Sequence, residues 1–294
     1  MTELLPSQKT AIVQAMLAKK SNFSGSEKMY ADSLSIHPSV YNQLKNGSAN
    51  PSLLSKGSWV SLARRLNVPL GNEQVWKTAV TEVYTMITKQ LEFAKLHSTS
   101  IVYCDDADTG KTFAAKDFVS RSKNAVYIDC SLVKTKQLLI RKLAGEFGID
   151  NTGKYNEVKN DLIYYLKTLE KPLVVLDEFG DIEYNTFLEI KALWNGTENY
   201  CAWYTIGADG LKVKLEKGRN TKKVGYAEFF RRFGSKYQKA TPLGKDDKQA
   251  FVLRALTAIA KANAPNQAVV PAIVKGCNGS LTRVKTEIKK LKTD

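Results

Sequence analysis

The residues of this chain best suited to chemistry lie in two short segments. Residues 105–112 read DDADTGKT; they follow Ser100–Cys104, a run typical of a strand, and precede an expected helix near Phe113–Ser120. In this setting backbone amides and the helix N-terminus cradle phosphates, a lysine neutralises the β and γ oxygens, and a hydroxyl holds Mg²⁺. The residues assigned to this binding loop are Asp108, Thr109, Gly110, Lys111, Thr112 and Phe113.

The second segment is Asp177-Glu178, at the end of the apolar run Pro172–Leu176. A continuous apolar run of this kind indicates a strand buried on both faces. Asp177 would hold the metal together with Thr112, and Glu178 would polarise the attacking water. The two segments together predict ATP and Mg²⁺ as ligands, although Asp105 stands at the first glycine position of GxxxxGK[ST].

The elements that position these residues follow a strand–helix alternation. Short apolar strands separated by helices predict an α/β fold with a mainly parallel, helix-covered sheet. The expected strands are 100–104, 124–129, 172–176 and 202–206, and the expected helices are 113–120, 134–147, 155–169 and 186–194. After residue 244 the pattern is entirely helical, at 245–262, 266–276 and 280–292.

The first 67 residues predict short helices and no strand. Apolar spacing and turn signals place these helices at 7–20, 26–33, 37–46 and 59–66, with Ser26 as a cap and Pro38 in a first turn. Pro69, Gly71 and Asn72 mark a linker. The expected domains are therefore 1–67, 68–240 and 241–294.

The charge is concentrated at the two ends of the chain. Of a net +15, residues 1–67 carry 8 basic and 3 acidic residues, and residues 211–294 carry 20 basic and 6 acidic. The middle holds 16 basic and 20 acidic residues. A basic excess at both ends predicts a polyanion such as nucleic acid as partner, although solvated lysines would give the same count.

Composition also excludes several classes of protein. The four cysteines form no CxxC pair, which argues against a zinc site and a disulfide framework, and two histidines leave little room for catalytic histidine chemistry. No apolar run approaches the length of a membrane span, and the N-terminus lacks a secretory signal pattern. We therefore expect a cytoplasmic protein.

Residues 104–112, CDDADTGKT, resemble the CGNPGVGKT loop of bacterial transposition ATPases of the AAA+ class, typified by phage Mu protein B, IS21-type helper ATPases and TniB/TnsC-like proteins. The resemblance covers nearly the whole chain. It implies a helix-turn-helix domain at 1–67, an AAA+ ATPase core at 68–240 and a helical lid at 241–294. Asp105 and Asp108 replace glycines of the family loop.

The resemblance also implies roles for single residues. Arg231 and Arg232 in AEFFRRF are arginine-finger candidates, Arg232 in the better register, which would reach the nucleotide of a neighbouring subunit. A solvated or DNA-facing helix explains the same pair. Arg283 in GSLTR matches the lid arginine that contacts phosphate. The family often places an asparagine as sensor 1 where this chain has Ala208, with Thr205 and Asp209 as the nearest polar residues.

Two regions are candidates for DNA contact. Residues 28–46 resemble a repressor-type helix-turn-helix, although plain three-helix packing gives the same apolar spacing. The side chains expected to reach DNA there are Ser39, Tyr41, Asn42, Gln43 and Lys45. Segment 211–223 lies where the family presents DNA-contacting residues, unless it is merely a solvated loop. Its cations are Lys212, Lys214, Lys217, Arg219, Lys222 and Lys223.

The resemblance implies an ATP-dependent protein that binds duplex DNA without sequence specificity, self-assembles on it as an oligomer or helical filament, and delivers it to a cognate transposase. It also implies a bacterial or phage origin. A helicase loader of the DnaC type is a rival, but such loaders carry a different N-terminal domain. A DNA-binding regulator with a decayed nucleotide site is another, favoured by the replaced glycines and the missing sensor asparagine.

Overall fold

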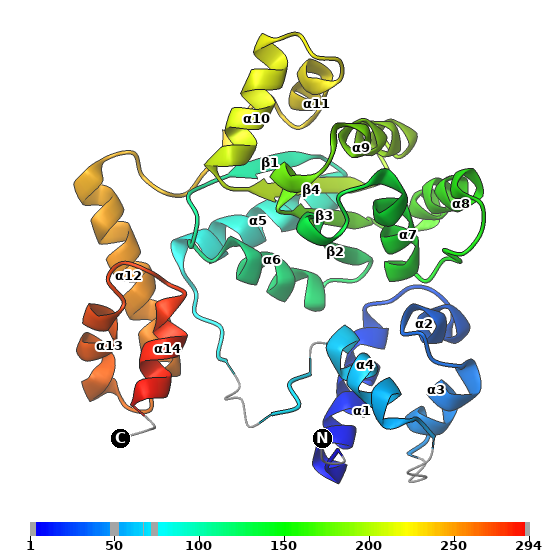
Figure 1. Ribbon diagram of the computed structural model, residues 1–294, viewed down its shortest axis with the longest axis horizontal. Helices are drawn as coiled ribbons and strands as arrows, with labels where there is room; N and C mark the ends of the chain where they lie inside the picture. The colour runs from blue at the N-terminus through cyan, green and yellow to red at the C-terminus, as the bar shows by residue number, and fades with distance from the viewer. Residues whose placement is uncertain (1–3, 48–52, 67, 72–75, 292–294) are drawn as a thin grey trace.

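A five-stranded parallel sheet forms the centre of the computed structural model (Figure 1), which describes residues 4–47, 53–66, 68–71 and 76–291. The strand order is β2-β3-β4-β1-β5. The strands are β1 (Ile101–Cys104), β2 (Ala125–Asp129), β3 (Leu173–Asp177), β4 (Ala202–Gly207) and β5 (Tyr237–Gln238). The expected mixed α/β fold with a parallel sheet is thus confirmed, and the two-residue β5 is an addition to it.

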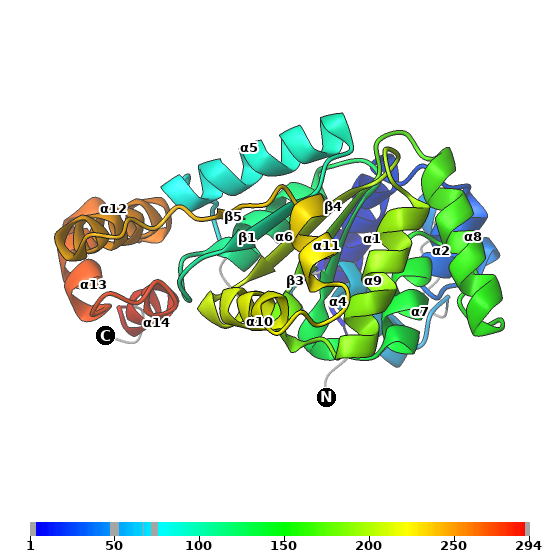
Figure 2. The same ribbon diagram turned by 90° about the horizontal axis from the view of Figure 1, so that it is seen from above.

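Helices cover both faces of this sheet. One face packs against α5 (Glu82–His97) and α6 (Lys111–Ser120). The other packs against α7 (Lys136–Glu146), α8 (Tyr155–Thr168), α9 (Tyr184–Gly196), α10 (Asp209–Asn220) and α11 (Tyr226–Arg232). Every residue of β3 and β4 is buried, as expected for parallel strands between two helical layers. Figure 2 shows the two layers from above.

The first helices form a separate apolar cluster. They are α1 (Pro6–Ser21), α2 (Glu27–Ser33), α3 (Pro38–Lys45) and α4 (Lys56–Leu66). Ser26 caps α2 by accepting from the amide of Met29 at 3.2 Å, as expected. These helices lie against the core, where Asn124 donates its amide to the carbonyl of Asn22 at 3.0 Å.

The last helices form another cluster, on the side of the sheet where β1 and β5 lie (Figure 2). They are α12 (Lys245–Asn263), α13 (Val270–Gly276) and α14 (Arg283–Lys290). Phe251 of α12 packs into the core layer formed by α5 and α6. Helix α12 therefore shares apolar contact with the sheet.

α5 is an element that the sequence pattern above does not predict, although its signal is present. Val83, Ile87, Leu91 and Ala94 recur at helical spacing and are all fully or almost fully buried. The segment 211–223 is not a loop, because α10 runs through Asn220. The expected boundary at Asn67, the linker residue Asn72 and the end of the last helix at residue 292 lie outside the described residues.

Within the described part of the chain, no helix is both long enough and apolar enough to cross a membrane.

Candidate functional site

The loop between β1 and α6 lies at the carboxyl edge of the sheet. Cys104 pairs in register with Gly207, so the ends of β1 and β4 are level at this edge. Gly110 caps α6 in the left-handed region, with φ of +89°, which a residue with a Cβ rarely adopts. The loop therefore ends on the N-terminus of a helix, where backbone amides attract anions.

Lys111 is folded back over its own loop. Its ammonium donates to the carbonyl of Asp105 at 3.1 Å and to that of Asp106. The side chain is buried, and this burial lowers the pKa of Lys111, while the neighbouring carboxylates of Asp105 and Asp177 oppose the shift. An entering phosphate would replace these carbonyls as the partner of the ammonium.

Thr112 and Asp177 lie together although 65 residues separate them. The Thr112 hydroxyl donates to Asp177 Oδ2 at 2.7 Å, and the Tyr127 hydroxyl donates to the same oxygen at 2.7 Å. A hydroxyl and a carboxylate fit Mg²⁺, which binds few protein oxygens and completes its shell with water and phosphate. Bound there, the ion would neutralise charge on the phosphates. In the described ranges no three His, Cys, Asp or Glu residues cluster to hold a metal by themselves.

Glu178 follows Asp177 in a left-handed conformation, with φ of +49°. Its own amide donates to Asp177 Oδ1 at 2.9 Å, which ties the strand end together. Partial burial, and then the neighbouring charges of Asp177 and Asp181, raise the pKa of Glu178 above its ordinary value. A carboxylate of raised basicity at a solvent-exposed strand end can accept a proton from water.

Asp105, at the first glycine position of the motif, points away from the loop. Its fully buried carboxylate accepts from the Tyr103 hydroxyl at 2.8 Å and from the amides of Ala240 and Thr241 at 3.0 and 3.2 Å. The second oxygen accepts from the amide of Asp106 at 2.8 Å. Asp105 thus joins the loop to the segment after β5 and does not face solvent.

Asp108 is also used within the chain. Its carboxylate accepts from the Ser280 hydroxyl at 2.6 Å and from the amide and hydroxyl of Thr282 at 3.0 and 2.5 Å. Arg283, the expected phosphate contact, is adjacent to this junction, but it pairs with Glu287 at 3.8 Å. The loop and the start of α14 are therefore in direct contact.

The other loop candidates take different positions. Thr109 is buried, and its hydroxyl donates to the carbonyl of Asp106 at 3.2 Å. Phe113 is partly exposed on the first turn of α6. At the end of β4, Ala208 caps α10 without a side-chain hydrogen bond, Thr205 is buried within the sheet, and Asp209 is exposed.

The two arginine-finger candidates differ in their surroundings. Arg231 is exposed on α11. Arg232, which the sequence favours by register, bonds the Asn195 side chain and lies 4.7 Å from the centre of the Trp194 ring. In this chain Arg231 is the one whose side chain is free to reach outward.

One expected DNA contact in the N-terminal helices is wrong. Tyr41 is 1% exposed and packs edge-on against Tyr30, with ring centres 5.7 Å apart, so its side chain belongs to the core of these helices. The exposed candidates on α3 are Ser39, Asn42, Gln43 and Lys45. The Lys45 ammonium is paired with Glu27.

The cations of segment 211–223 divide into two groups. Lys214 donates to the carbonyls of Gly180 and Ile182, both at 2.7 Å, and Arg219 lies 3.8 Å from the centre of the Phe230 ring. Their assignment to DNA contact is therefore wrong for Lys214 and weakened for Arg219. The exposed members are Lys212, Lys217, Lys222 and Lys223, of which Lys223 lies over the Tyr184 ring.

Several residues of the site are absent from the sequence-based assignment. Tyr127 holds Asp177, and Lys239 and Lys248 form ion pairs with Asp106. Tyr127 lies in an expected strand, so its position near the carboxyl edge of the sheet could have been predicted from the sequence. Lys239 follows a strand too short to detect, and Lys248 lies on a helix remote in sequence.

The comparisons with known proteins agree with this geometry. Residues 97–211, from the end of α5 to the first turn of α10, match the sequence model of an AAA domain family. No curated protein matches the chain. The matched residues contain the loop at 105–112 and the strand end at Asp177. The match supports a P-loop ATPase domain of the AAA type in this part of the chain, and such a domain binds ATP, usually with Mg²⁺.

Proposed function

We propose that this protein is an ATP-dependent, DNA-binding AAA+ ATPase that assembles on target duplex DNA and delivers it to a cognate transposase. The proposal depends above all on one observation, the meeting of Lys111, Thr112 and Asp177 at the carboxyl edge of the sheet. These residues are the lysine, hydroxyl and carboxylate that ATP and Mg²⁺ require.

The surface charge supports the DNA part of the proposal. Residues 211–294 carry 20 basic and 6 acidic residues, and the exposed lysines of α10 and the turn after it belong to this group. Contacts from such lysines to phosphates give affinity without sequence preference. Asn42 and Gln43 on the exposed face of α3 would add contacts from a helix-turn-helix domain.

Hydrolysis and assembly would use further residues. Glu178 would polarise the attacking water, and Arg231 would reach the nucleotide of a neighbouring copy from its exposed position on α11. The C-terminal helices α12 to α14 would act as the lid, because Ser280 and Thr282 already contact the phosphate loop. The delivery of DNA to a transposase follows from the resemblance described above.

A second candidate is a DNA-binding regulator whose nucleotide site has decayed. The observation that favours it is the use of the loop carboxylates as structural ties, together with Ala208 at the sensor position. ATP binding and turnover, measured with and without duplex DNA, separate the two candidates. We expect DNA-stimulated turnover in the wild type and none in Lys111→Ala.

The fold of the variant is checked by circular dichroism. ATP binding and ATP-dependent DNA binding that are unchanged in a folded Lys111→Ala protein would refute the phosphate-loop assignment. ATP binding without any turnover, on any duplex, would favour the regulator.

A further inference from the structure

Three lysine ammonium groups gather around one residue of the loop, Asp106. Lys111 donates to its carbonyl oxygen. Lys239 contacts its Oδ1 at 2.9 Å and also lies 3.9 Å from Oδ1 of Asp105, and Lys248 pairs with Oδ2 of Asp106. The two outer lysines come from different elements, since Lys239 follows β5 and Lys248 lies in the first turns of α12.

The position of these two lysines suits a polyanion. Lys248 belongs to the C-terminal helices and Lys239 to the segment between β5 and α12, whereas Lys111 is buried at the start of α6. The Lys239 and Lys248 side chains are 30% and 49% exposed, so solvent reaches part of each side chain. A lysine is a point charge on a flexible stem, which can change partners without movement of the backbone.

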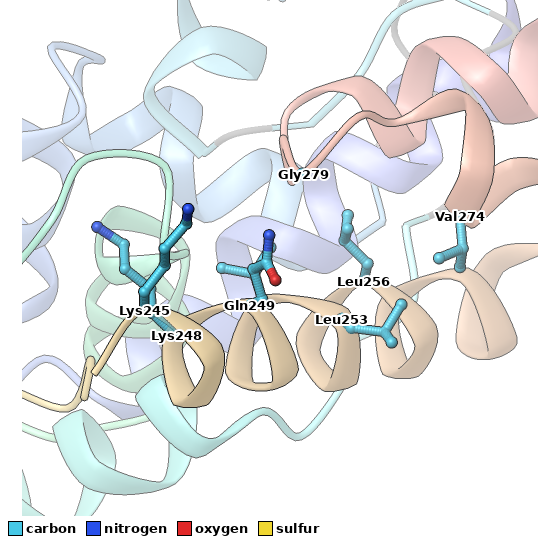
Figure 3. A pocket seen from close by; sticks show the side chains of 8 residues that line it. Lys245, Lys248, Gln249, Leu253, Leu256, Val274 and Gly279 are labelled. Atoms are coloured by element: carbon cyan, nitrogen blue, oxygen red, sulfur yellow. The ribbon is translucent and has the colours of Figure 1, made fainter. Parts of the chain in front are cut away.

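Lys248 also lines a pocket of about 370 Å³ along α12. Figure 3 shows Lys245 and Lys248 at one end of this pocket, with Leu253 and Val274 towards the other. The pocket thus has a cationic end close to the phosphate loop and an apolar remainder. An anionic ligand with an apolar group matches this distribution.

We propose that Lys239 and Lys248 bind the phosphates of the nucleotide, and that Asp106 holds the two lysines in place until the nucleotide enters. This inference rests on the proposed nucleotide function and adds two phosphate-binding residues to it. Arg283, expected in that role, is paired with Glu287 on its own helix. Entry of a triphosphate transfers the ammonium groups from the loop carboxylates, chiefly that of Asp106, to a more highly charged partner.

A purely structural role for these ion pairs predicts a different pattern. If the ion pairs only held α12 against the loop, loss of a lysine and loss of the Asp106 carboxylate would weaken nucleotide binding to a similar extent. If the lysines bind phosphate, Asp106 competes with the nucleotide. Lysine variants then weaken binding, whereas Asp106→Asn leaves binding as tight as in the wild type or tighter.

The experiment is calorimetric titration of the full chain with ATP and with AMP, in the presence of Mg²⁺. We expect Lys239→Gln and Lys248→Gln each to weaken ATP binding about tenfold, as for the loss of one charge-assisted hydrogen bond, and to affect AMP less. Lys261→Gln is the matched control, because it removes the same charge from the other end of α12.

Wild-type ATP affinity in both lysine variants would overturn the inference, as would an Asp106→Asn protein that binds ATP as weakly as Lys248→Gln does. Urea unfolding of each variant shows whether its fold is intact. Lys111→Ala, measured alongside, distinguishes the two proposals. If only that variant loses ATP binding, the further inference fails alone; if it binds normally, the nucleotide function fails with it.

Discussion

Asp105→Asn tests whether the carboxylate at the first glycine position is a structural tie. The side chain is fully buried and accepts hydrogen bonds from Tyr103, Asp106, Ala240 and Thr241. Asparagine has nearly the same shape, but it removes the negative charge and places an NH₂ group among donors. Hydrogen bonds to a charged group contribute about 1.5–3 kcal/mol each. We expect the free energy of unfolding to fall by about 3 kcal/mol, a large part of the roughly 5–15 kcal/mol typical of a domain.

Urea unfolding followed by tryptophan fluorescence measures this loss, and hydrogen exchange at Ala240 and Thr241 locates it. Asp161→Asn is the matched control, since it makes the same change at an exposed position of α8. Its cost should be below about 1 kcal/mol, as is usual for surface substitutions. An unchanged urea midpoint in Asp105→Asn would refute this role for Asp105.

Three further predictions concern hydrolysis, DNA binding and the N-terminal helices. Glu178→Gln should slow ATP turnover while ATP stays bound. The Glu178 carboxylate must be ionised to accept a proton, and its pKa is raised. Wild-type turnover should therefore begin to decline, as the pH is lowered, at a pH above 4.5, the ordinary pKa of glutamate. Neutralising three exposed lysines should weaken binding to two unrelated duplexes equally and flatten the log–log salt dependence by roughly 0.9 per lost phosphate contact; the set is Lys212, Lys217 and Lys222. Tyr41→Ala should destabilise the N-terminal helices by about 3–5 kcal/mol in thermal unfolding, since it removes a buried ring.

Each of these predictions has a contrary outcome. If Glu178→Gln hydrolysed ATP at the wild-type rate, Glu178 would have a structural role and no role in catalysis. An unchanged salt slope in the triple-lysine variant would mean that this surface is only solvated. Lys214→Gln serves as its control: its ammonium is bound to Gly180 and Ile182, so the change should lower stability and leave the salt slope unaltered. If Tyr41→Ala were as stable as the wild type but bound DNA more weakly, Tyr41 would be a DNA contact and not a core residue.

Local sequence patterns were sufficient for most of the elements. The apolar run that becomes β3 indicates a buried strand by itself. Ser26 caps α2 through a hydrogen bond with Met29, only three residues along the chain. The convergence of Thr112 and Asp177 was also predictable, because the carboxyl ends of parallel strands meet at one edge of the sheet. These inferences depend on neighbours along the chain or on a general property of parallel sheets.

Side-chain partners remote in sequence depended on the tertiary structure. The sequence does not distinguish a loop carboxylate that faces a phosphate from one that bonds the protein itself. The position of residues 240–241 shows that the Asp105 carboxylate bonds the protein. Lys214 and Lys217 are alike in the sequence, yet Lys214 reaches the carbonyls of Gly180 and Ile182 while Lys217 faces solvent, because the rotation of α10 against the core separates them. The sequence by itself determined where the phosphate loop lies; the packing of the C-terminal helices decided which charges surround it.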